Sequence, residues 1–194
     1  MAKVHFFYST MNAGKSTALL QSAHNYHETG NETILFIPRE DAEKNSGLIK
    51  SRIGLKASAV VIDSKIKIFE YVKSEAAKKS IDAILIDEAQ FLKKHQVLEM
   101  CKVCDQLEIP VMCYGIRTDF QGDLFEGSSA LLAIADNLIE LKTICSECDK
   151  KATMVVRLDE NGNVLLKGNK VLVGGNDIYK TVCRKHFRKL TNLI

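Results

Sequence analysis

The feature that most constrains this fold is the segment 9–16, which reads Ser-Thr-Met-Asn-Ala-Gly-Lys-Ser. An apolar run at 4–8 predicts a buried strand before it, and a helical pattern at 15–28 follows it. Gly-Lys-Ser between a strand and a helix is typical of a phosphate-binding loop. In such a loop Gly14 lets the backbone approach an anion, Lys15 reaches the outer phosphates, and the Ser16 hydroxyl can bind Mg²⁺. The usual pattern opens with Gly, whereas this chain has Ser9 there, so the strand-loop-helix context carries the interpretation against a chance match.

Strands and helices alternate over the first two-thirds of the chain. Further apolar strands are expected at 33–37, 83–86 and 111–114, and further helices at 65–79 and 93–107. Strands separated by helices predict an α/β fold with a central parallel sheet, and unbroken apolar strands fit a sheet that is covered on both faces. The polar segment 39–50 is expected to be a mobile loop.

Two adjacent acids, Asp87 and Glu88, follow the apolar strand at 83–86. Ligands of a parallel sheet gather at the carboxyl ends of its strands, where the phosphate loop also lies. Asp87 is therefore expected to hold Mg²⁺ beside Ser16. Glu88 points to the other face of the strand and can act on a nucleophile. That nucleophile would be water in an ATPase and a substrate hydroxyl in a kinase, and these residues alone leave both classes open.

Two short cysteine motifs near the C-terminus predict a metal site. Cys145-x-x-Cys148 and Cys183-x-x-His186 together supply the four ligands of a tetrahedral Zn²⁺ site. Because the protein fills all four positions, the zinc is expected to be structural. The motifs bracket a predicted hairpin, 155–158 and 164–166, so we expect an ATP-binding phosphate-loop domain at 1–141 and a small zinc-bound β module at 142–194. The remaining cysteines, Cys101, Cys104 and Cys113, are expected to be core residues.

The composition is that of a globular protein. Hydrophobic residues make up 46% of the chain and charged residues 26%, which excludes a disordered protein. Apolar runs are too short for a membrane helix, and the first residues lack the apolar core of a signal peptide, so we expect a cytoplasmic protein without a membrane partner. The net charge of +3 is too small to indicate a nucleic-acid-binding protein by itself.

Several motifs, taken in order, resemble those of one enzyme family. They are the phosphate loop 11–16, the acidic segment Asp-Glu-Ala-Gln-Phe at 87–91, the segment Tyr-Gly-Ile-Arg-Thr-Asp-Phe at 114–120, and the four predicted metal ligands. In these segments the chain resembles the thymidine kinases, in particular the bacterial type II enzymes, from about residue 3 to residue 190. The resemblance implies a phosphate-loop core and a zinc-bound lasso that closes over the substrate.

The resemblance also implies the reaction and the residues that carry it out. The family transfers the γ-phosphate of ATP to the 5′-hydroxyl of thymidine, and Glu88 corresponds to its catalytic base. The ATP site would consist of Ser9, Thr10, Met11, Asn12, Ala13, Gly14, Lys15, Ser16, Asp87 and Gln90. Thymidine would be bound by Phe120, Lys170, Val171, Leu172, Val173, Gly174 and Tyr179. Family members are commonly homotetramers and are often inhibited by thymidine triphosphate.

One departure from the family and two alternative functions remain. The family often has Asp-x-Arg after the second strand, whereas this chain has Asp41-Ala42-Glu43, so a phosphate contact from that arginine is lost or supplied elsewhere. One alternative function is a phosphate-loop ATPase whose zinc ribbon binds nucleic acid. The other is a kinase for another nucleoside, and here we expect deoxyuridine to be accepted and deoxycytidine to be rejected.

Overall fold

A six-stranded parallel sheet forms the centre of the computed structural model, which describes residues 1–170 and 178–193. The strand order is β5-β2-β6-β7-β1-β8, and each neighbouring pair is parallel. The predicted α/β fold is confirmed. The strands are β1 (Val4–Ser9), β2 (Thr33–Pro38), β5 (Val60–Ile62), β6 (Ala83–Ile86), β7 (Val111–Ile116) and β8 (Asn137–Glu140).

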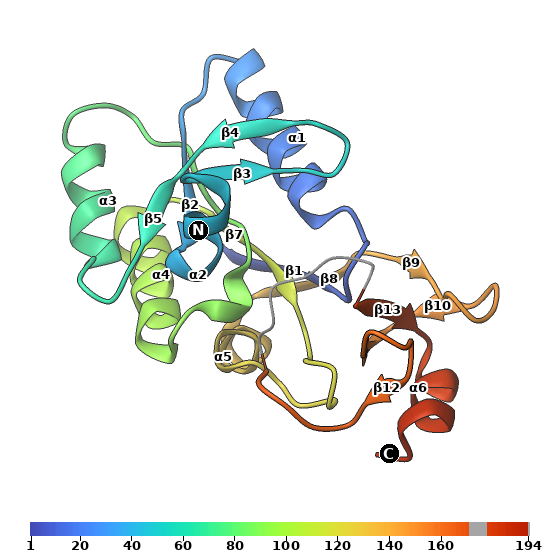
Figure 1. Ribbon diagram of the computed structural model, residues 1–194. Helices are drawn as coiled ribbons and strands as arrows, with labels where there is room; N and C mark the ends of the chain where they lie inside the picture. The colour runs from blue at the N-terminus through green and yellow to red at the C-terminus, as the bar shows by residue number, and fades with distance from the viewer. Residues whose placement is uncertain (171–177, 194) are drawn as a thin grey trace.

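Helices cover both faces of this sheet (Figure 1). One apolar cluster joins Phe6, Phe36 and Ile84 of the strands to α3, α4 and α5. A second cluster joins Leu35 and Leu85 to α1 and α2 on the opposite face, since successive strand side chains alternate. Burial on both faces explains the unbroken apolar strands in the sequence. The helices are α1 (Lys15–Glu28), α2 (Arg39–Asn45), α3 (Ile68–Ala76), α4 (Lys94–Leu107), α5 (Glu126–Ile134) and α6 (Arg184–Thr191).

Two predictions about secondary structure are wrong. The segment 39–50 contains α2 and strand β3 (Leu48–Lys50) instead of a loop, because Ala42 and Ile49 are apolar anchors buried in the core. Strand β3 pairs with β4 (Lys56–Ser58) as a hairpin outside the main sheet. Helix α3 starts three residues later than predicted, because the Asp63 carboxylate accepts the backbone N–H groups of Lys65 and Ile66 and holds them in a turn.

A smaller group of strands follows the main sheet, and α6 packs against it (Figure 1). The predicted hairpin is confirmed by the antiparallel pairing of β11 with β12, and β11 also pairs with β13. Val156 and Phe187 are fully buried in a small core of their own. The strands are β9 (Thr143–Ile144), β10 (Lys151–Ala152), β11 (Met154–Leu158), β12 (Val164–Leu165) and β13 (Tyr179–Val182). Among the described residues no helix combines the length and the apolar character that spanning a membrane requires.

Candidate active site

The phosphate loop connects β1 to α1 in a conformation that leaves the helix N-terminus open. Gly14 has φ +72° and precedes the first helical residue, and no described side chain caps this helix end. The first amides of α1 are thus left to bind an anion. Lys15 is buried, and its ammonium donates a hydrogen bond of 2.8 Å to the carbonyl of Thr10. Burial lowers the pKa of Lys15, while the nearby carboxylates of Glu88 and Asp87 act in the opposite direction.

Asp87 lies at the end of β6 and faces the phosphate loop. Burial, reinforced by the negative charge of Glu88, raises its pKa to about 7, although a hydrogen bond from Ser16 opposes the shift. Its Oδ1 atom is buried without a hydrogen-bond partner among the described residues. A buried carboxylate oxygen without a partner, beside a serine hydroxyl, fits one side of a Mg²⁺ coordination shell. Ser16 and Asp87 are therefore the residues that would hold Mg²⁺ together with the phosphates of a nucleotide.

Glu88 has a left-handed backbone conformation, with φ +48° and ψ +39°, which is uncommon for a residue other than glycine. It precedes the short 3-10 helix η1 (Ala89–Phe91), and its half-buried carboxylate accepts a hydrogen bond from the side-chain amide N–H of Gln90. The side-chain oxygen Oε1 of Gln90 in turn accepts a hydrogen bond from the backbone N–H of Ile116 at 3.1 Å. The Gln90 side chain can approach β7 this closely because residue 115 is glycine; a Cβ atom there would lie 2.9 Å from Gln90 Oε1. The Glu88 carboxylate is thus held in position by Gln90, which is itself hydrogen-bonded to β7.

One cleft of about 740 Å³ unites most of the predicted site residues. Its walls come from the main sheet and from the smaller strands, and Thr10 Oγ1 links the two by donating to the Met154 carbonyl at 3.0 Å. Ser9 makes a similar contact, from its hydroxyl to the carbonyl of Leu141 at 2.5 Å. The predicted residues that line the cleft are Met11, Asn12, Gly14, Lys15, Ser16, Asp87, Glu88, Gln90, Phe120, Lys170 and Tyr179. The predicted substrate residues Val171, Leu172, Val173 and Gly174 lie outside the described residues.

The four predicted metal ligands meet in the smaller group of strands and α6, and none of them is among the residues that line the cleft. The donor atoms of Cys145, Cys148, Cys183 and His186 all lie within 4.8 Å of one another. His186 Nδ1 is 3.3 Å from Cys183 Sγ and 3.5 Å from Cys145 Sγ. Burial disfavours the Cys145 thiolate, but backbone N–H groups of Cys183 and Glu147 and the His186 ring outweigh it and lower the pKa of Cys145 to about 6. Three thiol groups and one imidazole at this spacing fit a tetrahedral Zn²⁺ ion.

Comparison with known proteins identifies the family. The sequence model of the thymidine kinase family matches residues 2–187. The chain is 50% identical over 194 residues to a protein named thymidine kinase from Zymomonas mobilis, with 100% of both chains covered. It is 51% identical over 189 residues to a thymidine kinase from Rhodopirellula baltica, which covers 97% of this chain and 89% of that protein. A thymidine kinase from Salmonella typhimurium is 49% identical over 188 residues, with 97% and 91% covered. The chain belongs to the thymidine kinase family.

Several aromatic residues of this thymidine kinase family member line the same cleft as Glu88. Phe120 is almost fully buried, with 1% of its surface exposed, yet it lines the cleft together with Phe125 and Tyr179. Phe125 was not predicted from the sequence. A second aromatic residue five positions after Phe120, close behind a strand of the sheet, is the signal that could have identified it.

A cation from an unexpected segment also reaches the cleft. Glu43, at the position where the family often has arginine, is exposed on α2, whereas Asp41 lines the cleft. Arg52, in the turn between β3 and β4, lines the same cleft and donates a hydrogen bond to the Asn12 side chain of the phosphate loop. Its charge also helps to lower the pKa of Lys15, after the larger effects of burial and the two acids. Arg52 carries no motif, so the sequence alone could not single it out.

Proposed function

We propose that this member of the thymidine kinase family transfers the γ-phosphate of ATP to the 5′-hydroxyl of thymidine with Glu88 as the general base. The observation that carries this proposal is the position of the Glu88 carboxylate. It lines the same cleft as the phosphate loop and the aromatic residues Phe120 and Phe125. A base that shares one cleft with a phosphate site and aromatic side chains suits a sugar hydroxyl that must meet a γ-phosphate in line.

The protein's part in the transfer is positioning and charge stabilisation. Glu88 accepts the proton of the 5′-hydroxyl while that oxygen bonds to the γ-phosphorus and the bond to the bridging oxygen of ADP breaks. Gln90 orients the base through the hydrogen bond to its carboxylate. The ammonium of Lys15 and the first amides of α1 stabilise the charge on the transferring group. Mg²⁺, when bound, neutralises charge on the phosphate oxygens, and Ser16 and Asp87 would hold it.

Arg52 is a cation of the cleft that could replace the family's arginine. It contacts the phosphate loop through Asn12, and guanidinium groups recognise phosphate oxygens with two parallel hydrogen bonds. We therefore assign it a contact with the outer phosphates of ATP.

The nucleoside is expected to lie against Phe120, Phe125 and Tyr179, with Lys170 at the edge of the same cleft. Aromatic faces suit a pyrimidine base. The predicted contacts of residues 171–174 would read the polar edge of the base through backbone N–H and C=O groups, which suit thymine and uracil but not the exocyclic amine of cytosine.

The finer predictions about metals and partners rest on the family resemblance. The ion at the Cys145 cluster would be a structural Zn²⁺ that fixes the ends of the segment 149–182. A homotetramer, inhibition by thymidine triphosphate and a cytoplasmic location are also predictions of the resemblance. Molar mass measured by light scattering and inhibition assays with thymidine triphosphate test the first two.

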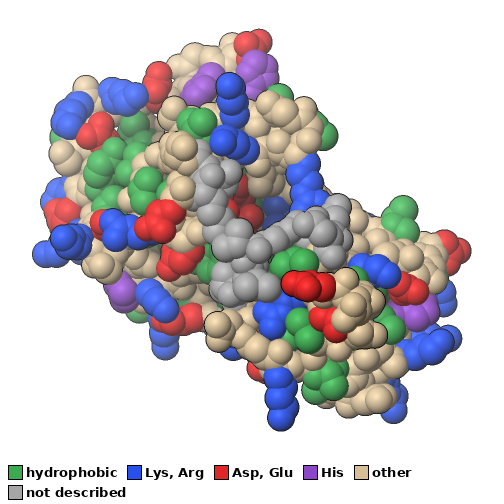
Figure 2. All heavy atoms as spheres, in the orientation of Figure 1, with side chains coloured by type: hydrophobic (Ala, Val, Ile, Leu, Met, Phe, Trp, Pro, Cys, Tyr) green, Lys and Arg blue, Asp and Glu red, His purple; other side chains and the backbone are tan. Residues whose placement is uncertain are grey.

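A panel of nucleosides with labelled ATP tests the function directly. We expect phosphate transfer to thymidine, weaker transfer to deoxyuridine and no transfer to deoxycytidine. ATP hydrolysis that is stimulated by DNA or RNA, without transfer to any nucleoside, would replace the proposal by the ATPase alternative. On the face shown in Figure 2, basic and acidic side chains are interspersed, which does not favour a nucleic-acid surface there.

A further inference from the structure

We propose that Arg157 is a positioning residue for the nucleoside, which acts by fixing Phe120 from behind and by holding the segment 167–170 beside the cleft. This inference rests on the proposed function. Arg157 lies on β11, is only 4% exposed, and is not among the residues that line the cleft. Its guanidinium, however, contacts Phe120, which lines the cleft, and the backbone at 167–169, which leads to Lys170 in the same cleft.

The Arg157 guanidinium makes one contact with an aromatic ring and two with backbone carbonyls. Its Cζ atom lies 3.8 Å from the centre of the Phe120 ring, in a cation–π arrangement. Its Nη1 donates to the carbonyl of Asn169 at 2.7 Å, and its Nη2 donates to the carbonyl of Lys167 at 3.3 Å. A Cβ atom on Gly168 would lie 2.1 Å from Nη2, so the chain at 167–169 is wrapped closely around this group. The guanidinium of Arg157 thus connects the Phe120 ring to the backbone of residues 167–169.

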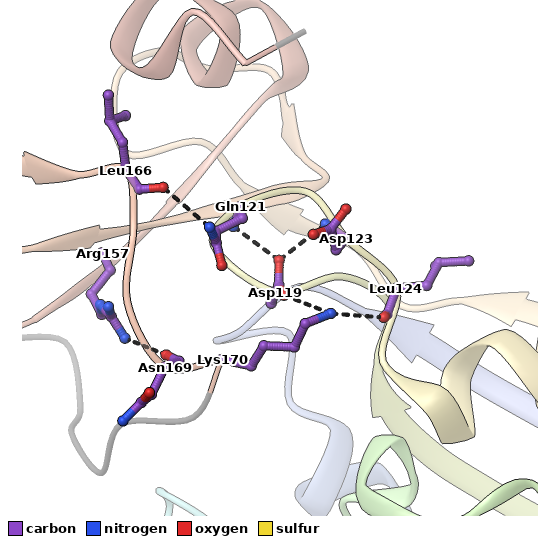
Figure 3. Close-up of polar contacts among 8 residues, drawn as sticks. All are labelled: Asp119, Gln121, Asp123, Leu124, Arg157, Leu166, Asn169 and Lys170. Carbon is purple, nitrogen blue, oxygen red and sulfur yellow. Dashed lines mark hydrogen bonds and ion pairs between the residues drawn. The ribbon is translucent and has the colours of Figure 1, made fainter.

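A second set of contacts fixes the same two segments to each other (Figure 3). Asp119, the residue before Phe120, has a fully buried side chain whose Oδ1 accepts the backbone N–H groups of Gln121 and Asp123. Its Oδ2 faces the Lys170 ammonium at 3.4 Å. The Gln121 amide donates to the carbonyl of Leu166 at 3.2 Å. The loop that carries Phe120 and the segment that carries Lys170 are therefore joined at both ends, with Arg157 between them.

The energetic situation of Arg157 favours a role beyond packing. A buried guanidinium is costly unless its N–H groups are paired, and the Nε of Arg157 has no partner among the described residues. An apolar residue could fill the same space in a small β module without that cost. Only the planar fork can stack on a ring and donate to two carbonyls at once. The presence of an arginine here is explained if the geometry of Phe120 and Lys170 matters for binding.

Replacing Arg157 by Met tests this inference, with Arg117→Met as the matched control. Arg117 donates to the carbonyl of Thr153 at 3.4 Å and so also joins the main sheet to the smaller strands, whereas the cation–π contact with Phe120 comes from Arg157. We expect R157M to raise KM for thymidine roughly tenfold or more, with KM for ATP and kcat within about twofold of wild type. R117M should leave KM for thymidine unchanged. An unchanged KM for thymidine in a folded R157M protein, or an equal rise in both KM values, overturns the inference.

A second pair of variants keeps the arginine at position 157 and avoids the risk that R157M does not fold. Gly168→Ala adds a methyl group against the guanidinium at a residue with φ +142°, whereas Gly162→Ala adds one in open space at a residue with φ +81°. Both variants strain the backbone, but only G168A displaces Arg157. We expect several-fold higher KM for thymidine in G168A alone, and equal values in the two variants contradict the inference. Wild type assayed in parallel separates the two proposals, since failure of wild type to phosphorylate thymidine refutes the function itself.

Discussion

Adding one methyl group at Gly127 should slow catalysis although this residue is not among those that line the cleft. Gly127 is buried in α5, where a Cβ atom would lie 2.4 Å from the carbonyl oxygen of Ala89, 2.8 Å from that of Leu92 and 3.0 Å from that of Gln90. Real Cβ atoms essentially never lie closer than 3.0 Å to such atoms, so α5 and η1 must separate by about 0.6 Å, the difference between 3.0 and 2.4 Å. Since η1 follows Glu88 directly, we expect Gly127→Ala to displace Glu88, the proposed catalytic base.

The expected effect on rate is larger than the effect on stability. A misplacement of about 1 Å can lower a rate about 100-fold, so a shift of this size should lower kcat by roughly 10- to 100-fold. Overpacking costs about 1–3 kcal/mol, and the better helix propensity of Ala returns about 1 kcal/mol. The net loss of about 0–2 kcal/mol corresponds to a fall in Tm of less than about 8 °C for a chain of this size.

Steady-state kinetics and thermal melts of G127A test this reasoning. Ser129→Ala, an exposed position of the same helix, is the control and should leave both kcat and Tm near wild type. A kcat of G127A within twofold of wild type would show that the packing of α5 against η1 does not set the position of Glu88. A loss of activity equal to the fraction of protein unfolded at the assay temperature would equally refute it.

Four further changes test other parts of the site. Glu88→Gln should lower kcat about 10²- to 10⁴-fold while calorimetry shows ATP and thymidine still binding; near-normal turnover removes Glu88 as the base. Cys148→Ser should lower both the zinc content and Tm, and a normal metal content at this variant would exclude Cys148 as a ligand. Because the pKa of Asp87 is raised from 3.8 to about 7, the folded protein keeps a proton that the unfolded chain has released. Without Mg²⁺ its stability should therefore fall as pH rises from about 4 to about 7, and melts in chelator should show a smaller fall for Asp87→Asn. Arg52→Met should raise KM for ATP roughly tenfold and spare KM for thymidine, and the reverse pattern would place Arg52 elsewhere.

The central sheet could be predicted because its strands are buried on both faces and are therefore visible as short apolar runs. Strand β6, for example, was located residue by residue from Ala-Ile-Leu-Ile alone. Helix α2 and the β3–β4 hairpin were missed because each is anchored by one or two apolar residues among many polar ones, such as Ala42 and Ile49. Such elements are stabilised by tertiary contacts and give no periodic signal of their own.

The chemical groups of the site were easier to predict than their geometry. Lys15, Asp87 and Glu88 were found because a motif and a strand end fix each of them locally. The left-handed conformation of Glu88 and the support it receives from Gln90 depend on Gly115 and Gly127, which approach η1 from other elements. No local sequence pattern predicts such contacts between segments that are distant in the sequence. Phe125 and Arg157 escaped prediction for the same reason.

The exchange of an acid for the family's arginine shows why position in the sequence and position in space must be separated. Phosphate transfer needs positive charge at the outer phosphates, and it does not matter which segment supplies it. Here Glu43 turns outward on α2, while Arg52 reaches the phosphate loop from the neighbouring hairpin. Arg52 lines the same cleft as the phosphate loop. Under the proposed function, its guanidinium supplies the positive charge that Glu43 does not, and the kinetics of Arg52→Met test this assignment.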